Sequence, residues 1–502
     1  MVRIVTEYLD AAASAFPDKI AFADEKKQVT FAQLKLDAQC IATEIIRRKI
    51  FKSPVAIYMD KGTDCVSAFL GTVYSGNFYS PLDTDMPASR IEKIMATLEP
   101  EIIITNQAHY KTAKSFGGDS RILVLEEMLS GKPETALIAT VTDRMLDTDI
   151  LYVLFTSGST GMPKGVTISH KALIDFTEWG TERFGINETW VFGNQTPFYF
   201  SMSVFDIYQT LKNGATTYII PHEKFSFPAL LMEYLKQYEI NTLYWVPTAL
   251  SFVAICGALN CPHVDSLKNI FFSGEVMPVK QLNRWIREYP EARYVNLYGP
   301  TELTDVCTAY EVNRTFSDQE TLPMGQACRN MDVFLLDAAD KPVPDGEIGE
   351  VCVRGTGLSY GYYGDPEKTA EVFVQNPLQT RYPETIYRTG DLARKNEFGE
   401  LVYVSRKDFQ IKHMGHRIEL GEIEAAVSSL EGIDSCCCLY NGKRQWIILY
   451  YTGGIEENLL TEQLKNLVPG YMLPNKKYRI EKMPLNLNGK IDRQKLKDMA
   501  GI

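Results

Sequence analysis

Short apolar runs alternate with longer amphipathic stretches through the first part of the chain. Residues 31–50 have the spacing of a helix with one apolar face, and residues 55–59 and 101–105 have the composition of short buried strands. Strands that alternate with helices usually form a largely parallel sheet with helices on both faces. The pattern therefore predicts an α/β fold with doubly wound sheets.

The same alternation returns after residue 165. A helix is expected over residues 170–184, and a second series of strands follows it. These strands are expected over residues 190–194, 216–220, 242–245, 269–272 and 293–297. Ligands of such folds gather at the carboxyl ends of parallel strands. Two polar segments, 273–275 and 298–302, directly follow strands of this series, so we expect a ligand site at that edge of the sheet.

The composition changes beyond residue 312. Residues 346–369 hold many glycines and few helix formers, which indicates a smaller β-rich subdomain. Strand and helix signals mix again toward the C-terminus, over a length typical of a small domain. We therefore predict an N-terminal core over residues 1–404, a hinge at 405–407 and a small mobile α+β domain over 408–502.

The bulk composition narrows the class of protein. A chain of 502 residues with 45% hydrophobic and 23% charged residues is typical of a globular protein with more than one domain. Its net charge of -11 argues against nucleic acid as a partner, since a duplex binder needs a basic face. No uncharged apolar run is long enough to span a membrane, and Glu7 and Asp10 interrupt the N-terminal apolar stretch, unlike in a signal peptide. We expect a cytoplasmic protein without a membrane partner.

Cysteine and histidine give no metal-binding pattern. The ten cysteines lack zinc-finger spacing, and residues 436–438 are three consecutive cysteines that we expect as small hydrophobes in a buried strand. His413 and His416 form the one close histidine pair, which we interpret as loop residues rather than ligands. We therefore expect a reducing environment and no structural metal.

The segment LYVLFTSGSTGMPKGV, residues 151–166, begins as an apolar strand and continues into a loop of small and hydroxyl residues. Glycines, hydroxyl groups and a lysine together suit the phosphates of a nucleotide. The predicted phosphate-binding residues are Thr156, Ser157, Gly158, Ser159, Thr160, Gly161 and Lys164. The spacing differs from that of a P-loop NTPase, because Pro163 precedes the lysine and a glycine follows it. Considered alone, the loop could equally be a polar surface turn.

Further motifs follow the same order as in one enzyme superfamily. They are FLGTVYSGNFYSPLD at 69–83, YGPTE at 298–302, YRTGDLAR at 387–394 and PLNLNGKIDR at 484–493. With the loop, they resemble the adenylate-forming enzymes: acyl-CoA synthetases, luciferases and the adenylation enzymes of nonribosomal peptide synthesis. The resemblance implies two half-reactions. A carboxylate attacks the α-phosphorus of ATP and releases pyrophosphate, and a thiol then takes the acyl group from the adenylate.

The resemblance also implies cofactors and residue roles. ATP and Mg²⁺ are the expected cofactors, and positioning and charge neutralisation are the main tasks of the protein. Lys490, Lys164 and Glu302 would be catalytic, Glu302 and Thr160 would lie near Mg²⁺, and Asp408 would be the hinge of the C-terminal domain. The other nucleotide contacts would come from Gly274, Glu275, Asn296, Tyr298, Gly299, Thr301, Asp391 and Arg406.

The acyl pocket departs from the pattern of enzymes that activate α-amino acids. Those enzymes usually place an aspartate against the α-ammonium group, and the matching position here is Ser201, which cannot neutralise a cation in a dry pocket. The other implied pocket residues are Met202, Phe205, Tyr244, Phe271, Ser273, Leu297, Asp305 and Val306. This largely apolar slot favours an aryl acid, such as a para-amino or para-hydroxy benzoate, or another acid whose polar group is far from the carboxyl. Asp305 would bind that group, or would instead face a helix N-terminus.

Four functions remain open on the sequence. The leading one is an acid ligase that loads the phosphopantetheine thiol of a separate carrier protein, because little chain follows Arg493. The likeness to D-alanine:carrier-protein ligase gives a second, although it must explain Ser201. An acyl-CoA synthetase that uses free coenzyme A is the third. A non-catalytic adenylate-binding protein is the fourth, and it is disfavoured because the implied catalytic residues are all present.

Overall fold

The computed structural model describes residues 2–118, 121–158, 162–407, 410–484 and 491–502. The chain forms two compact units. The core unit comprises Met1–Thr84, Leu98–Leu154 and Gly165–Lys407, and the small unit comprises Asp85–Thr97, Phe155–Lys164 and Asp408–Ile502. The fold is α/β, as predicted. In the described part of the chain, no helix is both long and apolar enough to cross a membrane.

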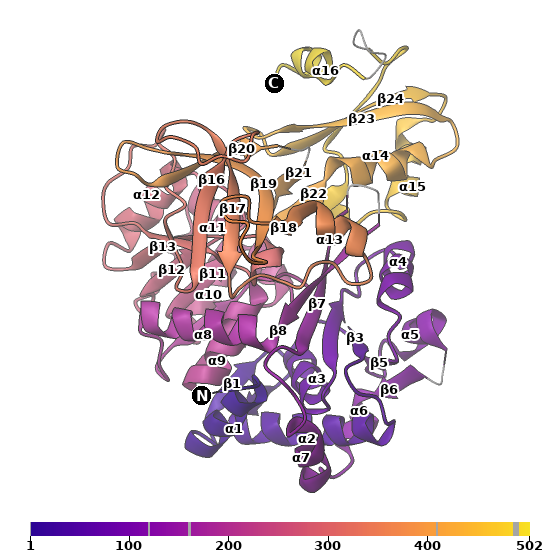
Figure 1. Cartoon of the computed structure of the whole chain (residues 1–502), viewed down its shortest axis with the longest axis vertical. Helices are drawn as coiled ribbons and strands as arrows, with labels where there is room; N and C mark the ends of the chain where they lie inside the picture. Colours follow the sequence, from indigo (N-terminus) through magenta and orange to yellow (C-terminus); the bar gives the residue numbers. More distant parts are fainter. Residues whose placement is uncertain (1, 119–120, 159–161, 408–409, 485–490) are drawn as a thin grey trace. The chain divides into compact units, whose positions relative to one another are not determined.

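One sheet of the fold has six strands (Figure 1). Their order is β6 (Ile122–Val124), β5 (Ile102–Thr105), β3 (Pro54–Tyr58), β4 (Phe78–Leu82), β7 (Ile150–Thr156) and β8 (Lys164–Ser169). The strands from β6 to β7 pair in parallel, as expected for apolar strands covered on both faces. The strands predicted over residues 55–59 and 101–105 are confirmed as β3 and β5.

A second sheet has nine strands. Their order is β15 (Gln326–Ala327), β14 (Thr308–Glu311), β13 (Arg293–Tyr298), β12 (Asn269–Phe272), β11 (Thr242–Trp245), β9 (Val191–Asn194), β10 (Thr216–Ile219), β1 (Ile20–Ala23) and β2 (Gln28–Thr30). The series from β1 to β13 is parallel, and β2, β14 and β15 pair antiparallel at the two edges. The two polar segments, 273–275 and 298–302, therefore follow neighbouring parallel strands, as predicted.

Two long helices of the core unit begin at a side-chain cap. Thr30 accepts a hydrogen bond from Gln33 N at the start of α2 (Phe31–Arg47), and Ser169 accepts one from Ala172 N at the start of α8 (His170–Phe184). The other helices of the core unit are α1 (Thr6–Ala15), α3 (Thr63–Tyr74), α5 (Tyr110–Gly117), α6 (Leu125–Leu129), α7 (Thr135–Thr142), α9 (Ser203–Asn213), α10 (Pro228–Gln237), α11 (Pro247–Ile255), α12 (Val279–Glu288) and α13 (Pro366–Val372), with 3-10 turns η2 (His222–Ser226) and η3 (Thr301–Leu303).

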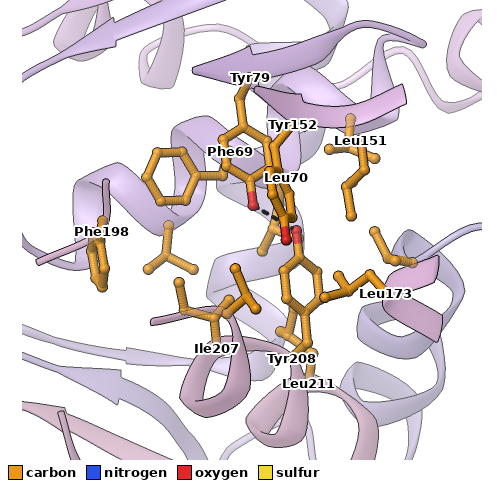
Figure 2. Close-up of a cluster of buried hydrophobic side chains, with 14 of the residues drawn as sticks. Phe69, Leu70, Tyr79, Leu151, Tyr152, Leu173, Phe198, Ile207, Tyr208 and Leu211 are labelled. Atoms are coloured by element: carbon orange, nitrogen blue, oxygen red, sulfur yellow. Dashed lines mark hydrogen bonds between the residues drawn. The ribbon is translucent and has the colours of Figure 1, made fainter. Parts of the chain in front are cut away.

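A cluster of buried aromatic side chains joins the six-stranded sheet to helices α3 and α9 (Figure 2). Phe69 of α3 stacks on Tyr79 of β4, with ring centroids 4.5 Å apart. The hydroxyl groups of Tyr79 and Tyr208 are 3.0 Å apart and form a buried hydrogen bond between β4 and α9. These contacts hold α9 in place, and the pocket residues Met202 and Phe205 lie at the start of this helix.

The predicted β-rich subdomain is an antiparallel sheet. It consists of β16 (Met331–Leu336), β17 (Gly349–Gly355), β18 (Phe373–Gln375), β19 (Thr385–Lys395) and β20 (Leu401–Arg406). Tyr362 lies in the loop between β17 and α13. An isolated β-bridge pairs it with Val166 of β8. Asp391 and Arg406 lie opposite each other on β19 and β20, so this sheet brings two predicted nucleotide ligands together.

The small unit has its own hydrophobic core. Its elements are α4 (Ala88–Leu98), the hairpin β21 (Gln410–His413) and β22 (His416–Glu419), α14 (Leu420–Ser428), β23 (Ile433–Asn441), β24 (Trp446–Gly453), α15 (Glu457–Leu464), η4 (Gly470–Met472), β25 (Lys476–Arg479) and α16 (Arg493–Ala500). Residues 436–438 are buried in β23, as predicted. The placement of His413 and His416 in a loop is wrong: they are opposite each other across the hairpin, and the His416 ring stacks on Tyr471 at 3.5 Å.

Candidate active site

The residues predicted to line the acyl pocket are all buried in the core unit. They come from α9, the segment before it, β11, β12, β13 and the turn after β13: Ser201, Met202, Phe205, Tyr244, Phe271, Ser273, Leu297, Asp305 and Val306. The apolar members belong to one hydrophobic cluster. The Phe205 ring meets Tyr244 edge-on at 5.2 Å and Phe271 at 6.2 Å. The structure therefore brings these side chains together, with aromatic rings against one another.

Asp305 is the carboxylic acid among these side chains. Its exposed fraction is 1%, Ser201 donates to its Oδ1 at 3.0 Å, and Tyr244 donates to its Oδ2 at 2.9 Å. Both donors are neutral hydroxyl groups, and they fix the orientation of the carboxyl group. The alternative role, a carboxylate at a helix N-terminus, does not describe this geometry, because both oxygens face pocket residues.

The turn that carries Asp305 is tightly built. Asp305 has a positive φ of 90°, and a Cβ on Gly299 would lie 2.4 Å from Asp305 O and 2.8 Å from Val306 Cα. We expect Gly299→Ala to displace this turn and to lower kcat/KM for acid activation about 10²-fold. ATP-pyrophosphate exchange measures this. Gly442→Ala is the matched control, because open space surrounds Gly442, and equal activity of both variants would contradict the expectation.

Burial raises the pKa of Asp305 to about 7, although the hydrogen bonds from Tyr244 and Ser201 oppose the shift. The unfolded chain loses this proton near its ordinary pKa of 3.8, while the folded protein keeps it until about pH 7. The free energy of unfolding should therefore fall as the pH rises from about 4 to 7, by at most about 1.4 kcal/mol per pH unit from this group. Urea denaturation of Asp305→Asn should show a weaker decline, and an unchanged slope would contradict the assignment.

The sequence reasoning missed a second buried carboxylic acid, which interacts electrostatically with Asp305. Asp206 of α9 is 1% exposed and accepts a hydrogen bond from Asn194 Nδ2 at 2.8 Å. Burial raises the pKa of Asp206 to about 7, and the ammonium of Lys61 counters this shift. Lys61 also donates to Gln195 O at 3.0 Å. An aspartate inside the otherwise apolar run SVFDIY was the signal that could have identified this group.

Three predicted nucleotide ligands form one chain of hydrogen bonds in the core unit. The Tyr298 hydroxyl donates to Asp391 Oδ2 at 2.6 Å, and Arg406 donates to Asp391 Oδ1 at 2.8 Å. Asp391 is 1% exposed, and the Arg406 side chain is 8% exposed. A buried carboxylate held on both sides is a rigid acceptor, as a pair of ribose hydroxyl groups would require.

Glu302 is fully buried in the turn after β13. Its Oε1 accepts a hydrogen bond from the Tyr362 hydroxyl at 2.8 Å, and its backbone O accepts one from Ser359 N. Sequence reasoning had not selected Tyr362, which lies in a Gly-rich stretch without a catalytic signature. The arrangement makes Glu302 a buried acid of fixed orientation rather than a surface acid.

The remaining nucleotide candidates have mainly backbone partners. Glu275 accepts from the backbone N–H and the hydroxyl of Thr248 at 2.9 and 2.6 Å, at the N-terminus of α11. Asn296 Nδ2 donates to Pro323 O at 2.8 Å. Gly274 has a positive φ of 92°, and Thr301 begins η3. These residues shape the turns at the edge of the sheet.

The described part of the phosphate-binding loop belongs to the small unit and contacts β22 and α14. The Ser157 hydroxyl donates to Arg417 O at 2.6 Å, and Gly158 N–H donates to the carboxylate of Glu422. A Cβ on Gly158 would lie 2.0 Å from Met162 O, so only glycine fits this turn. Two predicted phosphate donors therefore hold a carbonyl and a carboxylate in this structure.

Lys164 is a third predicted phosphate ligand that contacts another group of the small unit, here an acidic side chain. Its ammonium lies 3.8 Å from Glu419 Oε1, and the two side chains are only 13% and 9% exposed. A carboxylate here competes with a phosphate for the same cation. We expect Glu419→Gln to tighten the binding of magnesium pyrophosphate about three- to tenfold in calorimetric titration. Glu431→Gln, at an exposed position, should leave it unchanged, and weaker binding by Glu419→Gln would refute the competition.

Several predicted residues lie outside the described part of the chain. They are Ser159, Thr160 and Gly161 of the loop, the hinge residue Asp408 and the catalytic candidate Lys490. Their roles remain predictions. Among the described residues, three of the predicted ligand and substrate contacts, Glu302, Asp305 and Asp391, are buried carboxyl groups with hydrogen-bond donors against them.

Known proteins provide an independent comparison. The profile of AMP-binding enzymes matches residues 9–363. The chain is 32% identical over 495 residues to zwittermicin A synthase ZmaJ of Bacillus cereus, covering 96% of this chain and 92% of that protein. It is 32% identical over 511 residues to D-alanine:D-alanyl carrier protein ligase of Bacillus licheniformis, covering 98% of each.

Solved structures show the same fold. Holo-PA1221, a nonribosomal peptide synthetase protein with adenylation and carrier domains, matches with a TM-score of 0.84 at 22% identity, over 99% of this chain and 84% of that one. The Vibrio cholerae adenylation domain AlmE, in complex with glycyl-adenosine-5'-phosphate, matches with a TM-score of 0.84 at 21% identity, over 99% and 98%. These identities establish the fold alone.

Proposed function

Because the chain belongs to the family of AMP-binding enzymes, we propose that it adenylates a carboxylic acid without a recognised α-ammonium group and transfers it to a carrier protein. The chain is an AMP-forming ligase of the adenylation type. The thiol acceptor in this proposal is the phosphopantetheine arm of a separate carrier protein. Relatives that this chain covers over nearly their full length include D-alanine:D-alanyl carrier protein ligases, which supports this acceptor.

The observation that carries the substrate part of the proposal is the contact between Ser201 and Asp305. By resemblance, Ser201 occupies the position at which enzymes for α-amino acids carry the carboxylate that pairs with the α-ammonium. The carboxyl group present here belongs to Asp305, which accepts a hydrogen bond of 3.0 Å from Ser201. The surrounding Phe205, Tyr244 and Phe271 rings are suited to an apolar or flat substrate body. We therefore propose an aryl acid with a polar substituent, or another acid whose polar group is remote from its carboxyl.

The core unit offers groups for the nucleoside and its metal. Tyr298, Asp391 and Arg406 would bind the adenine and ribose side of ATP. Glu302 fits a Mg²⁺ ion that enters with the nucleotide, because Mg²⁺ is usually held by one or two carboxylates together with substrate phosphates. Among the described residues, no group of three or more metal-binding side chains forms a cage of its own. When bound, the ion would neutralise phosphate charge.

The small unit would supply the remaining charges. Ser157, Gly158 and Lys164, with the loop residues outside the described ranges, would bind the β- and γ-phosphates. Lys490 would neutralise the acid carboxylate and the α-phosphate during adenylation, and Asp408 would be the hinge between the two half-reactions. In this proposal the contacts of Lys164 and Gly158 with Glu419 and Glu422 belong to the state without pyrophosphate.

The test combines two assays on the purified chain. ATP-pyrophosphate exchange across a panel of benzoates, amino acids and short-chain acids should identify an activated acid, and Lys490→Ala should lose this exchange. A loading assay with a phosphopantetheinylated carrier protein and with coenzyme A separates the carrier ligase from an acyl-CoA synthetase. No exchange with any acid would favour a non-catalytic adenylate-binding protein instead.

D-Alanine is a second candidate substrate. Several relatives of about the same length are D-alanine:D-alanyl carrier protein ligases, at 31–32% identity over nearly the whole chain. In this case Asp305 would have to bind the α-ammonium in place of residue 201. Robust exchange with D-alanine, without exchange on benzoates, would establish this candidate over the aryl acid.

A further inference from the structure

Lys61 reaches from the six-stranded sheet to the segment between β9 and α9. It lies in the turn after β3, and its side chain is half-buried. The ammonium group donates to Gln195 O at 3.0 Å and lies 5.5 Å from the centre of the Phe198 ring. That ring packs edge-on against Phe69 of α3, with centroids 5.7 Å apart (Figure 2). One lysine therefore contacts both the main chain and a buried ring of the same segment.

The turn that carries Lys61 is itself fixed by hydrogen bonds. Asp24 accepts from the backbone N–H and the hydroxyl of Thr63 at 2.8 and 3.0 Å, at the start of α3. The Cys65 thiol donates to Asp60 O at 3.1 Å on the other side of Lys61. Because its backbone is fixed, the lysine can hold a second segment at a defined distance.

The segment that Lys61 contacts is irregular. The structure describes residues 195–202 throughout, and they form neither a helix nor a strand. Main chain without a regular hydrogen-bond ladder depends on contacts with other elements for its position. Ser201 and Met202, two residues predicted to line the acyl pocket, lie at the end of this segment.

Two adjacent residues are held from different elements where the chain leaves β9. Asn194, the last residue of β9, donates to Asp206 Oδ2 of α9 at 2.8 Å. The next residue, Gln195, accepts from Lys61. Asp206 also lies within electrostatic reach of the Lys61 ammonium. These contacts set the direction in which the main chain continues toward Ser201, six positions further along.

We infer that Lys61 is a positioning residue for the acid substrate: by holding the main chain at Gln195, it sets the place of Ser201 and Met202 among the acyl-pocket residues. This inference rests on the proposed function and adds a specificity-determining residue from outside the predicted pocket. The effect does not need a large movement, because a displacement of about 1 Å at a binding group can change a rate about 10²-fold.

The first experiment measures the segment itself and needs no substrate. Lys61→Met removes the ammonium group and keeps an apolar side chain. The amides of Phe200, Ser203 and Val204 donate hydrogen bonds within this part of the chain and report its order. We expect residues 198–205 to exchange amide hydrogen for deuterium about tenfold faster, the factor for one hydrogen bond from a charged donor. Lys61→Arg should restore slow exchange, and unchanged exchange in Lys61→Met would overturn the inference.

The second experiment measures the consequence for the acid. In ATP-pyrophosphate exchange with the acid that the wild-type enzyme prefers, Lys61→Met should raise the KM for the acid about tenfold and leave the KM for ATP within about twofold. The ratio of kcat/KM between the preferred acid and the next-best acid should fall about tenfold, and Lys61→Arg should recover most of it. A loss of stability alone lowers the amount of active enzyme and changes neither quantity.

Lys52→Met is the matched control. Lys52 is 46% exposed and pairs with Asp149 at 2.6 Å, so its loss should change neither the acid KM nor the ratio. Thermal denaturation checks that the variants fold. If Lys61→Met does not fold, Lys61→Gln gives the same two readouts, because its shorter side chain keeps N–H donors but ends before Gln195 O.

The outcomes separate this inference from the proposed function. If the wild-type enzyme supports exchange with no acid, the ligase activity fails, and the positioning role that rests on it fails too. If an acid is activated but Lys61→Met leaves its KM and the ratio unchanged, or raises both KM values equally, the ligase activity stands and the positioning role is refuted. If the acid KM alone rises and Lys61→Arg restores it, both stand.

Discussion

Glu302→Gln should lower kcat/KM for ATP-pyrophosphate exchange about 10²- to 10³-fold, the usual effect of removing one preorganised charge from a reaction centre. Glutamine has the same shape and can still accept from Tyr362, whose hydroxyl lies 2.8 Å from Glu302 Oε1. The fold should therefore persist while the anionic ligand for Mg²⁺ is lost. Exchange assays at several Mg²⁺ concentrations measure the effect, and a raised Mg²⁺ requirement is expected.

Tyr362→Phe is the matched control for this prediction. It removes the hydrogen bond to Glu302 but keeps the charge, so we expect a loss of less than about tenfold. If Glu302→Gln kept at least half of the wild-type activity, Glu302 would be a structural acid, and its place near the metal would be refuted. If both variants lost activity equally, orientation rather than charge would be the contribution of Glu302.

Asp391→Asn should raise the KM for ATP about 10²-fold and lower the free energy of unfolding by about 3 kcal/mol. The physical reason is the burial of its partners: the Arg406 side chain is 8% exposed and would lose the carboxylate that balances its charge. The amide would also remove one of the acceptors proposed for the ribose. Exchange kinetics and urea denaturation measure the two effects separately.

Two controls separate these contributions. Tyr298→Phe removes the 2.6 Å hydrogen bond to Asp391 without leaving a buried charge, so its stability loss should be about 1 kcal/mol. Asp340→Asn removes an ion pair to Arg388 in which Asp340 is 49% exposed, and should change neither quantity measurably. An Asp391→Asn enzyme with an unchanged KM for ATP would exclude Asp391 from the nucleotide site.

The sequence alone determined the elements and their order. The spacing of apolar residues and the local composition predicted the following elements to within a few residues: α2, α8, β3, β5, β9, β11, β12 and β13. This works because the repeat of buried side chains along a helix or a strand is set by the local backbone geometry. The same reasoning placed segments 273–275 and 298–302 at the ends of neighbouring strands. It failed for His413 and His416, since a two-residue hairpin and a loop leave almost the same local signal.

Only the tertiary structure decided which charged groups meet. Nothing local to position 201 or 305 predicts that Ser201 donates to Asp305, because the two residues are 104 positions apart and a turn with positive φ brings them together. The same holds for Tyr362 with Glu302 and for the buried Asp206. The local pattern of residues was enough to predict the architecture. The burial and pairing of charged groups depend on contacts between residues distant in sequence, so only the three-dimensional packing determined the electrostatic environment of the predicted acyl-pocket residues.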